Sequence, residues 1–235
     1  MTATPLLDIY AALERMHAWR GWHWWPDADP FEVCVGAILV QNTMWTNVER
    51  ALDRLRDAGA LHPGRMSALG QEELEELVRP SGQYRQKAKK LRAFLELIEA
   101  HGSLEALLAV EPGELRSRLL ATWGIGKETA DCIVAYAARQ PALVIDAYTM
   151  RLFGRLGRGP RSTSYDEWQD WMLAELDSER AAASHPESPR DLYCRFHALI
   201  VVHCKHLCTK AAPKCGQCQL AGECRFANTE RPLPG

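Results

Sequence analysis

Apolar residues recur at intervals of three and four along most of the chain. The segments FEVCVGAILVQNTMWTNVERALDRL (31–55) and WMLAELDSE (171–179) show this spacing, and no segment alternates apolar and polar residues over the length of a strand. Such spacing places apolar side chains on one face of an α-helix. Clusters of Gly, Pro and Ser, such as WWPDADP, RPSGQ and LGRGPRSTS, separate about ten helical segments. The pattern predicts an all-α protein.

Composition sets the scale of the fold and excludes some locations. With 235 residues and 47% hydrophobic content, the chain can bury the core of one large domain or of two modest ones. No apolar run approaches membrane-spanning length, and the start of the chain lacks the basic and cleavage signals of a secretory peptide. We therefore expect no membrane span and a cytoplasmic location.

Charge is unevenly distributed along the chain. The formal net charge of −2 argues against a uniformly basic surface. Between Glu76 and Glu96, however, no acidic residue occurs and six basic residues do, namely Arg79, Arg85, Lys87, Lys89, Lys90 and Arg92. This stretch predicts either a solvated basic helix face or a local patch that attracts a polyanion.

Four of the eight cysteines form a short array near the C-terminus. They are Cys208, Cys215, Cys218 and Cys224, spaced C-x6-C-x2-C-x5-C. In a reducing compartment, such an array favours a metal site over disulfides. Because zinc and iron-sulfur clusters both accept four thiolates, the ligand chemistry leaves the metal open.

A glycine turn divides ELRSRLLATWGIGKETADCIVAYA (114–137) into two helical segments. Gly124 and Gly126 lack a Cβ, and the helix that starts at Lys127 presents partial positive charge, so a phosphate fits against this turn. Downstream, Asp146 follows an apolar run and precedes a helical segment, which is typical of an N-cap.

These motifs together resemble the endonuclease III family of helix-hairpin-helix DNA glycosylases. The resemblance rests on the glycine turn, on VIDAYTMRL around Asp146, on PFEVCVGAILVQNT and on the cysteine spacing. It implies a six-helix barrel at 28–140 with the hairpin at about 115–136, and a second helical domain from 1–27 and 141–235. It also implies one 4Fe-4S cluster in the loop 208–224, bound by the four cysteines of the array.

The resemblance assigns roles to individual residues. Asp146 would be the catalytic carboxylate, and Gly124, Gly126, Lys127 and Thr129 would contact the DNA backbone. Gln41 would fill the space left by an extruded nucleotide, with Gln83 or Tyr84 wedging from the other side. A base pocket would include Trp24, Trp25 and Trp45, although tryptophans at helical spacing are commonly core residues.

Glu128 occupies the position at which bifunctional members of the family carry a Schiff-base lysine. A carboxylate cannot form an imine, and Lys127 is rotated by roughly 100 degrees on a helix. We therefore expect a monofunctional glycosylase in which Glu128 orients water or the departing base. Alternatively, Glu128 has a structural role: its negative charge interacts favourably with the positive end of the helix dipole at the helix start.

The tryptophan-rich entrance and the motifs GIGKETAD and VIDAYT look most like the 3-methyladenine glycosylase branch of this family. A cationic methylated purine would gain from stacking on electron-rich rings. Two other functions remain open: an endonuclease III paralogue with lyase activity on oxidised pyrimidines, and a damage-binding module without catalysis. In each case the implied partner is double-stranded DNA with a damaged base or abasic site, bound by a nucleoid-associated monomer.

Overall fold

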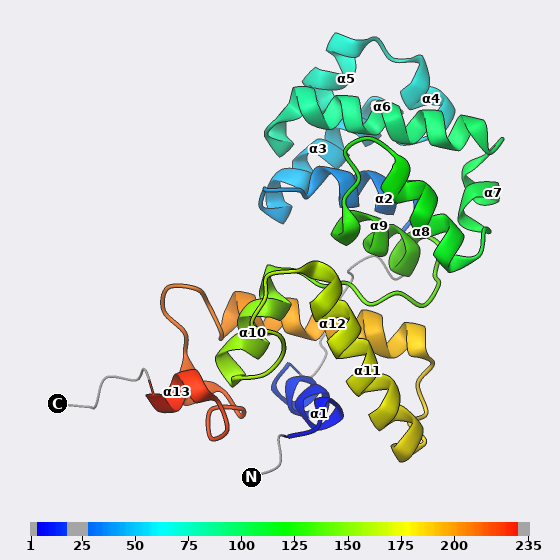
Figure 1. Ribbon diagram of the computed structural model, residues 1–235. Helices are drawn as coiled ribbons and strands as arrows, with labels where there is room; N and C mark the ends of the chain where they lie inside the picture. The colour runs from blue at the N-terminus through cyan, green and yellow to red at the C-terminus, as the bar shows by residue number, and fades with distance from the viewer. Residues whose placement is uncertain (1–3, 18–27, 230–235) are drawn as a thin grey trace. The chain divides into compact units, whose positions relative to one another are not determined.

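The computed structural model describes residues 4–17 and 28–229, and every regular element within these ranges is helical. This confirms the all-α prediction. No helix in the described part of the chain is long and apolar enough to cross a membrane. The chain divides into two compact units, one comprising 25–142 and the other comprising 1–24 with 143–235. The helices of both units are labelled in Figure 1.

The 25–142 unit is built around helix α2. Its regular elements are α2 (Pro30–Leu39), α3 (Trp45–Asp57), α4 (Pro63–Ala68), α5 (Gln71–Val78), the 3-10 turn η1 (Arg79–Ser81), α6 (Tyr84–Ala100), α7 (Leu104–Leu108), α8 (Pro112–Ala121), α9 (Lys127–Cys132) and the π-helical turn η2 (Ile133–Ala137). Helix α2 is buried on nearly all sides and packs against α3, α6, α9 and η2. A helix that is apolar all round belongs in the centre of a unit.

The apolar segment 31–55 forms two helices. Asp29 caps α2, because its Oδ1 accepts the backbone N-H of Phe31 at 2.8 Å. The break between α2 and α3 contains Asn42 at a φ of 55°, in the left-handed region that tight turns require. Helix α3 then buries only one face, formed by Val48, Ala51, Leu52 and Leu55. This short turn carries Gln41.

The other unit combines one N-terminal helix with the C-terminal part of the chain, from residue 143 onward. It contains α1 (Leu6–Met16), α10 (Ala147–Leu156), α11 (Tyr165–Ala183), α12 (Pro189–His206), the 3-10 turn η3 (Cys215–Gln217) and α13 (Arg225–Thr229). Helix α1 packs against α11 and α12 although more than 140 residues separate them in sequence. This packing joins both ends of the chain in one unit.

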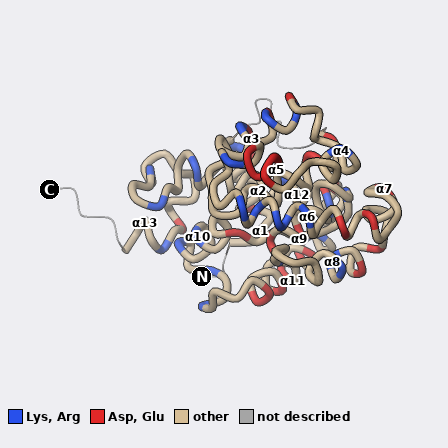
Figure 2. Tube along the Cα trace, turned by 90° about the horizontal axis from the view of Figure 1, so that it is seen from above, with Lys and Arg blue, Asp and Glu red and all other residues tan. Residues whose placement is uncertain are grey.

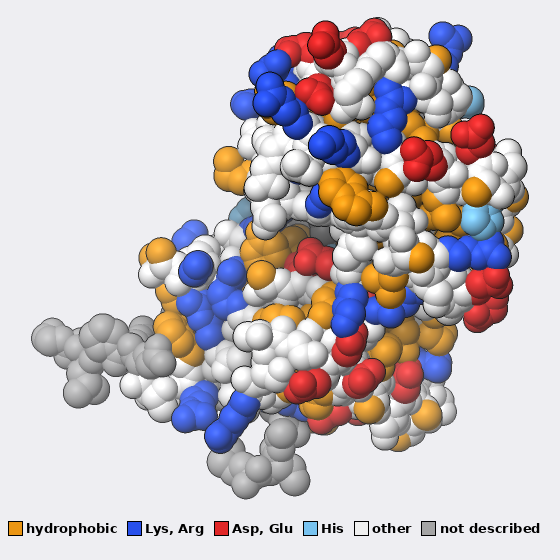
Figure 3. Space-filling model, turned by 45° about the horizontal axis from the view of Figure 1, so that its top comes forward, with side chains coloured by type: hydrophobic (Ala, Val, Ile, Leu, Met, Phe, Trp, Pro, Cys, Tyr) orange, Lys and Arg blue, Asp and Glu red, His pale blue; other side chains and the backbone are white. Residues whose placement is uncertain are grey.

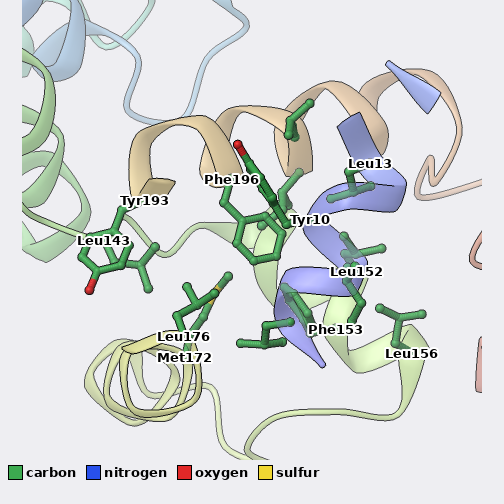
Figure 4. Packing of buried hydrophobic residues seen from close by; sticks show 14 of the residues in the cluster. Tyr10, Leu13, Leu143, Leu152, Phe153, Leu156, Met172, Leu176, Tyr193 and Phe196 are labelled. Carbon is green, nitrogen blue, oxygen red and sulfur yellow. The ribbon is translucent and has the colours of Figure 1, made fainter. Parts of the chain in front are cut away.

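The core of this second unit is aromatic at its centre. Phe196 of α12 makes edge-to-face contacts with Tyr10 of α1 at 5.4 Å and with Phe153 of α10 at 6.1 Å between ring centroids. Figure 4 shows these rings surrounded by aliphatic side chains, including Met172 and Leu176 of α11. Edge-to-face aromatic pairs add to the stabilisation from burial. The core therefore fixes α10, the helix that Asp146 caps.

Candidate active site and cysteine loop

The glycine turn joins α8 to α9, and its two glycines differ in what the fold requires of them. Gly124 has a φ of 82°, and a Cβ built there would lie 2.4 Å from Cγ of Lys90. Gly126 has an ordinary φ of −93° and would have no heavy atom within 4 Å of its Cβ. The fold therefore requires glycine at 124, whereas at 126 glycine leaves open space beside the first turn of α9.

Gln41 is bound to this turn. Its Nε2 donates to the carbonyl oxygen of Gly124 at 3.4 Å and to Oγ1 of Thr129 at 3.1 Å. Its Oε1 accepts a hydrogen bond from Nζ of Lys90, and burial lowers the pKa of that lysine. The Thr129 side chain is buried. The structure thus places Gln41 and Thr129 in an internal network, and their predicted contacts with DNA stay predictions.

The loop before α6 holds the other predicted wedge residues. Gln83 is exposed and has a φ of 46°, a left-handed conformation that costs a non-glycine residue about 1–3 kcal/mol. Two guanidinium groups lie over the Tyr84 ring. Their central carbons are 4.4 Å from the ring centroid for Arg79 and 5.7 Å for Arg85. Strain of this size is common in loops that bind ligands. The predicted wedge therefore stands at a distorted, exposed position.

The basic stretch 79–92 does not form a continuous solvated face, which corrects one interpretation of the sequence. Lys87 is fully buried, donates to the carbonyl oxygen of Ser81, and has its pKa lowered to about 8 by burial and by the charge of Lys90. Arg92 donates to the carbonyl oxygen of Ser67 at 3.0 Å and also to that of Leu69. These cations bind carbonyl groups that the ends of short helices leave unpaired. Lys and Arg positions are interspersed with acidic ones along the chain (Figure 2).

Residues Lys127 and Glu128 open helix α9, and both side chains are exposed. Consecutive helical positions point about 100 degrees apart, so the two side chains leave α9 in different directions. Trp45 is half-buried at the start of α3, where its Nε1 donates to Oε1 of Glu49 at 2.9 Å. The other predicted pocket residues, Trp24 and Trp25, lie outside the described residues.

Asp146 is the N-cap of α10 and is 9% exposed. Its Oδ1 accepts hydrogen bonds from the backbone N-H of Thr149 at 2.7 Å and from Oγ1 of the same residue at 2.9 Å. Its Oδ2 lies 3.5 Å from Nε2 of His197. Burial alone would raise the pKa of Asp146, but the hydrogen bond and charge of His197 and the two donors of Thr149 lower it below the ordinary value. The site therefore holds a buried but ionised carboxylate.

His197 was missed by sequence reasoning. It lies on α12 among apolar residues and is only 3% exposed. A single histidine on an apolar helix face is usually a core residue, and its partner Asp146 lies far away in the sequence. The only signal available was its type, because imidazole is a common partner of a functional carboxylate.

The four cysteines of the array line one pocket, together with apolar side chains such as Leu152 of α10 and Leu207, which directly follows α12. All four are free thiols, which excludes disulfides within the array in this structure. Among the described residues, no three metal-binding side chains are close enough to share one ion. In a cluster each thiolate binds a different iron, so the sulfur atoms need not converge on one point. A four-thiolate, apolar pocket fits such a cluster.

An arginine anchors the same loop. Nη1 of Arg155 donates to Sγ of Cys208 at 3.2 Å and to the carbonyl oxygen of Thr209 at 2.8 Å. Arg151 adds bonds from Nε to the carbonyl oxygen of Cys208 at 3.1 Å and from Nη2 to that of Cys204 at 3.2 Å. Helix α10, which Asp146 caps, therefore also holds the cysteine loop.

The matching region of the sequence defines the class of protein. Residues 35–172 match the HhH-GPD superfamily of base excision DNA repair proteins. The match covers more than half of the chain, and the chain therefore belongs to this superfamily. The protein is a DNA glycosylase of base excision repair, as the resemblance predicted.

Individual relatives share most of the chain. It is 39% identical to "Putative DNA repair glycosylase MJ1434" of Methanocaldococcus jannaschii, over 86% of this chain and 88% of that protein. The crystal structure of H. pylori 3-methyladenine DNA glycosylase (MagIII) bound to 1,N6-ethenoadenine is 31% identical, with a TM-score of 0.74 over 86% of this chain and 98% of that one. The structure of a non-covalent endonuclease III-DNA complex matches with a TM-score of 0.78 at 22% identity. The match covers 97% of this chain and 99% of that chain. These matches confirm the glycosylase fold.

Proposed function

We propose that this glycosylase hydrolyses the N-glycosidic bond of alkylated purines in duplex DNA and that it is monofunctional. The observation that carries the proposal is the buried carboxylate of Asp146, which accepts two hydrogen bonds from Thr149 and lies against His197. Positive charge develops on the sugar as the base departs, and a preorganised anion in a poorly solvated site stabilises that charge. The donors of Thr149 and His197 fix the orientation of this anion before the nucleotide arrives.

Glu128 supports the monofunctional mechanism. A lyase needs an amine that attacks the sugar carbon, and position 128 carries a carboxylate instead. Glu128, exposed at the start of α9, orients the attacking water or the departing base, while Lys127 and the amide of Gly126 hold a backbone phosphate. The C1′–N bond breaks, its electron pair leaves with the cationic base as a neutral purine, and water supplies the hydroxyl group while its proton is released to solvent.

The substrate class is supported by chemistry and by one relative. A methylated purine such as 3-methyladenine is cationic, so it stacks favourably on tryptophan and leaves with little protonation. Trp24, Trp25 and Trp45 are the predicted aromatic residues. The 31%-identical H. pylori enzyme is a 3-methyladenine glycosylase with an alkylated adenine bound, and we infer a related substrate for this chain.

The cysteine loop is proposed to hold one 4Fe-4S cluster through Cys208, Cys215, Cys218 and Cys224. The cluster supplies structural cross-linking when bound, because a short loop cannot build a core of its own. Arg155 is suited to a thiolate ligand, since it already donates to Sγ of Cys208. The loop then presents its own lysines and backbone to DNA in one fixed conformation.

A panel of duplexes with single lesions tests this function. The purified protein is incubated with DNA containing 3-methyladenine, 1,N6-ethenoadenine, thymine glycol or an abasic site, each with and without alkaline cleavage. We expect release of the two alkylated purines, strand breaks only after alkali, and no borohydride capture on the abasic duplex. Release of thymine glycol alone would contradict the proposed substrate class and favour oxidised pyrimidines. Efficient borohydride capture would contradict the monofunctional mechanism and implicate an amine, with Lys127 as the first candidate. No release from any duplex would favour a damage-binding module.

A further inference from the structure

Two large hydrophobic side chains are exposed in the described part of the 25–142 unit. Met44 is 70% exposed and Trp123 is 56% exposed. Met44 lies in the short turn between α2 and α3, and Trp123 lies in the glycine turn between α8 and α9. Figure 3 shows hydrophobic and basic side chains reaching the surface of this unit. Contiguous exposed apolar patches mark binding surfaces, whereas single exposed side chains need a further observation.

The two loops are physically connected. Gln41, three residues before Met44, donates to the carbonyl oxygen of Gly124, which directly follows Trp123. Lys90 completes the connection by donating to Gln41, and its methylene groups lie against Gly124. Met44 and Trp123 therefore sit on turns that are hydrogen-bonded to each other.

The fold gives no reason for methionine at position 44. Met44 is the N-cap of α3, where its side chain makes no capping hydrogen bond. Ser, Thr, Asp or Asn at this position would accept a hydrogen bond from a backbone N-H of the first turn. Exposure likewise disfavours an apolar side chain. Neither helix capping nor core packing explains this residue, and its turn is hydrogen-bonded to the hairpin.

We propose that Met44 is an apolar wedge that enters the base stack beside the extruded nucleotide, and that Trp123 packs against the adjacent nucleotide of the same strand. This inference rests on the proposed function, because it needs a flipped base. Apolar side chains, methionine and leucine included, insert between base steps and part them. The Gln41 amide is already bound to the hairpin and to Lys90, so Met44 is better placed to fill the stack.

Duplexes with 2-aminopurine beside a tetrahydrofuran abasic analogue test the wedge. Fluorescence of 2-aminopurine rises when its stacking is broken. For Met44→Ala we expect the rise to disappear and the affinity for this duplex to fall about tenfold, as the loss of one buried apolar side chain predicts. Met44→Leu keeps the bulk and should behave as the parent. Affinity for the undamaged duplex should stay unchanged, because an intact stack resists insertion.

Met44→Ser separates recognition from folding. Serine supplies the missing cap, so we expect a higher Tm together with the same loss of fluorescence and affinity. Trp123→Ala should weaken binding of both duplexes, and Trp123→Phe should restore it. The proposal that Met44 is the wedge would be overturned if Met44→Ala gave the same fluorescence rise as the parent. It would also be overturned if only Gln41→Ala lost the rise. If the parent releases alkylated bases but Met44→Ala behaves as the parent, only this inference fails; if the parent releases none, the proposed function fails.

Discussion

The two glycines of the hairpin allow the same substitution to be tested in two environments two residues apart. At Gly124, alanine must adopt a φ of 82°, which costs about 1–2 kcal/mol for a residue with a Cβ. The new methyl group would also lie 2.4 Å from Cγ of Lys90. This carbon is close to the backbone of α6, so Lys90 must change rotamer and release Gln41.

The magnitude follows from these two losses. A hydrogen bond from a charged donor contributes about 1.5–3 kcal/mol when shielded, and the lower end applies here because Lys90 is only half-buried. Together with the backbone cost, Gly124→Ala should lower the free energy of unfolding by about 2–4 kcal/mol. For a protein of this size, that corresponds to a fall in Tm of roughly 5–15 °C.

Gly126→Ala is the matched control for stability. Its φ is ordinary and its Cβ position is open, so a gain of about 0.4–1 kcal/mol from a less flexible unfolded chain offsets the poorer cap that alanine makes. The Tm should stay near that of the parent. If the open space admits a DNA phosphate, however, the methyl group should weaken duplex binding by about two- to tenfold, equivalent to one hydrogen bond.

Thermal unfolding followed by circular dichroism and duplex binding by anisotropy measure the two effects. We expect Gly124→Ala to lose stability and Gly126→Ala to lose only affinity. A parental Tm for Gly124→Ala would refute the idea that Lys90 and the turn are tightly packed. A parental affinity for Gly126→Ala would refute close approach of DNA at that point.

Four further variants test the carboxylates and the cysteine loop. Asp146→Asn keeps the N-cap but removes the charge, so base release in single turnovers should fall by about 100-fold or more with little change in Tm. His197→Gln should raise the pKa of Asp146, because His197 lowers it in the parent. Activity needs the ionised carboxylate and is lost as pH falls through this pKa, so the acid limb of the kcat/KM profile should move to higher pH. Glu128→Lys should gain borohydride capture on abasic DNA, which the parent and a Lys127→Gln control lack. Cys218→Ser should lose visible iron-sulfur absorbance and lower the Tm; unchanged absorbance would exclude Cys218 as a ligand.

Local signals explain what the sequence could predict. Asp146 precedes a run with helical periodicity, and the structure shows the N-cap that this order predicts. The glycine turn was visible for the same reason, because Gly124 has the positive φ that only a few residue types tolerate. The helical class required only apolar spacing. Each of these features depends on neighbours within a few positions of the chain.

Partners distant in sequence explain what could not be predicted. Lys90 and Gln41 are separated by 49 positions, and nothing in either segment indicates the hydrogen bond that joins them. The charge of Lys87 was visible, but its burial against a backbone carbonyl was not. His197 and Asp146 meet only because α10 and α12 pack together. A charged residue in the sequence therefore does not reveal whether its charge faces a ligand or a helix end.

This internal use of charge bears on how a chain of net charge −2 grips a polyanion. Lys90 donates to Gln41 beside the turn that carries Met44, and its methylene groups lie against Gly124 in the turn that carries Trp123. Rigid turns reduce the entropy lost on binding, which raises affinity without additional surface charge. Affinity obtained in this way depends on fit to a deformed duplex more than on attraction to any duplex. Such a balance suits a glycosylase that must release undamaged DNA quickly and hold damaged DNA long enough to cleave the glycosidic bond.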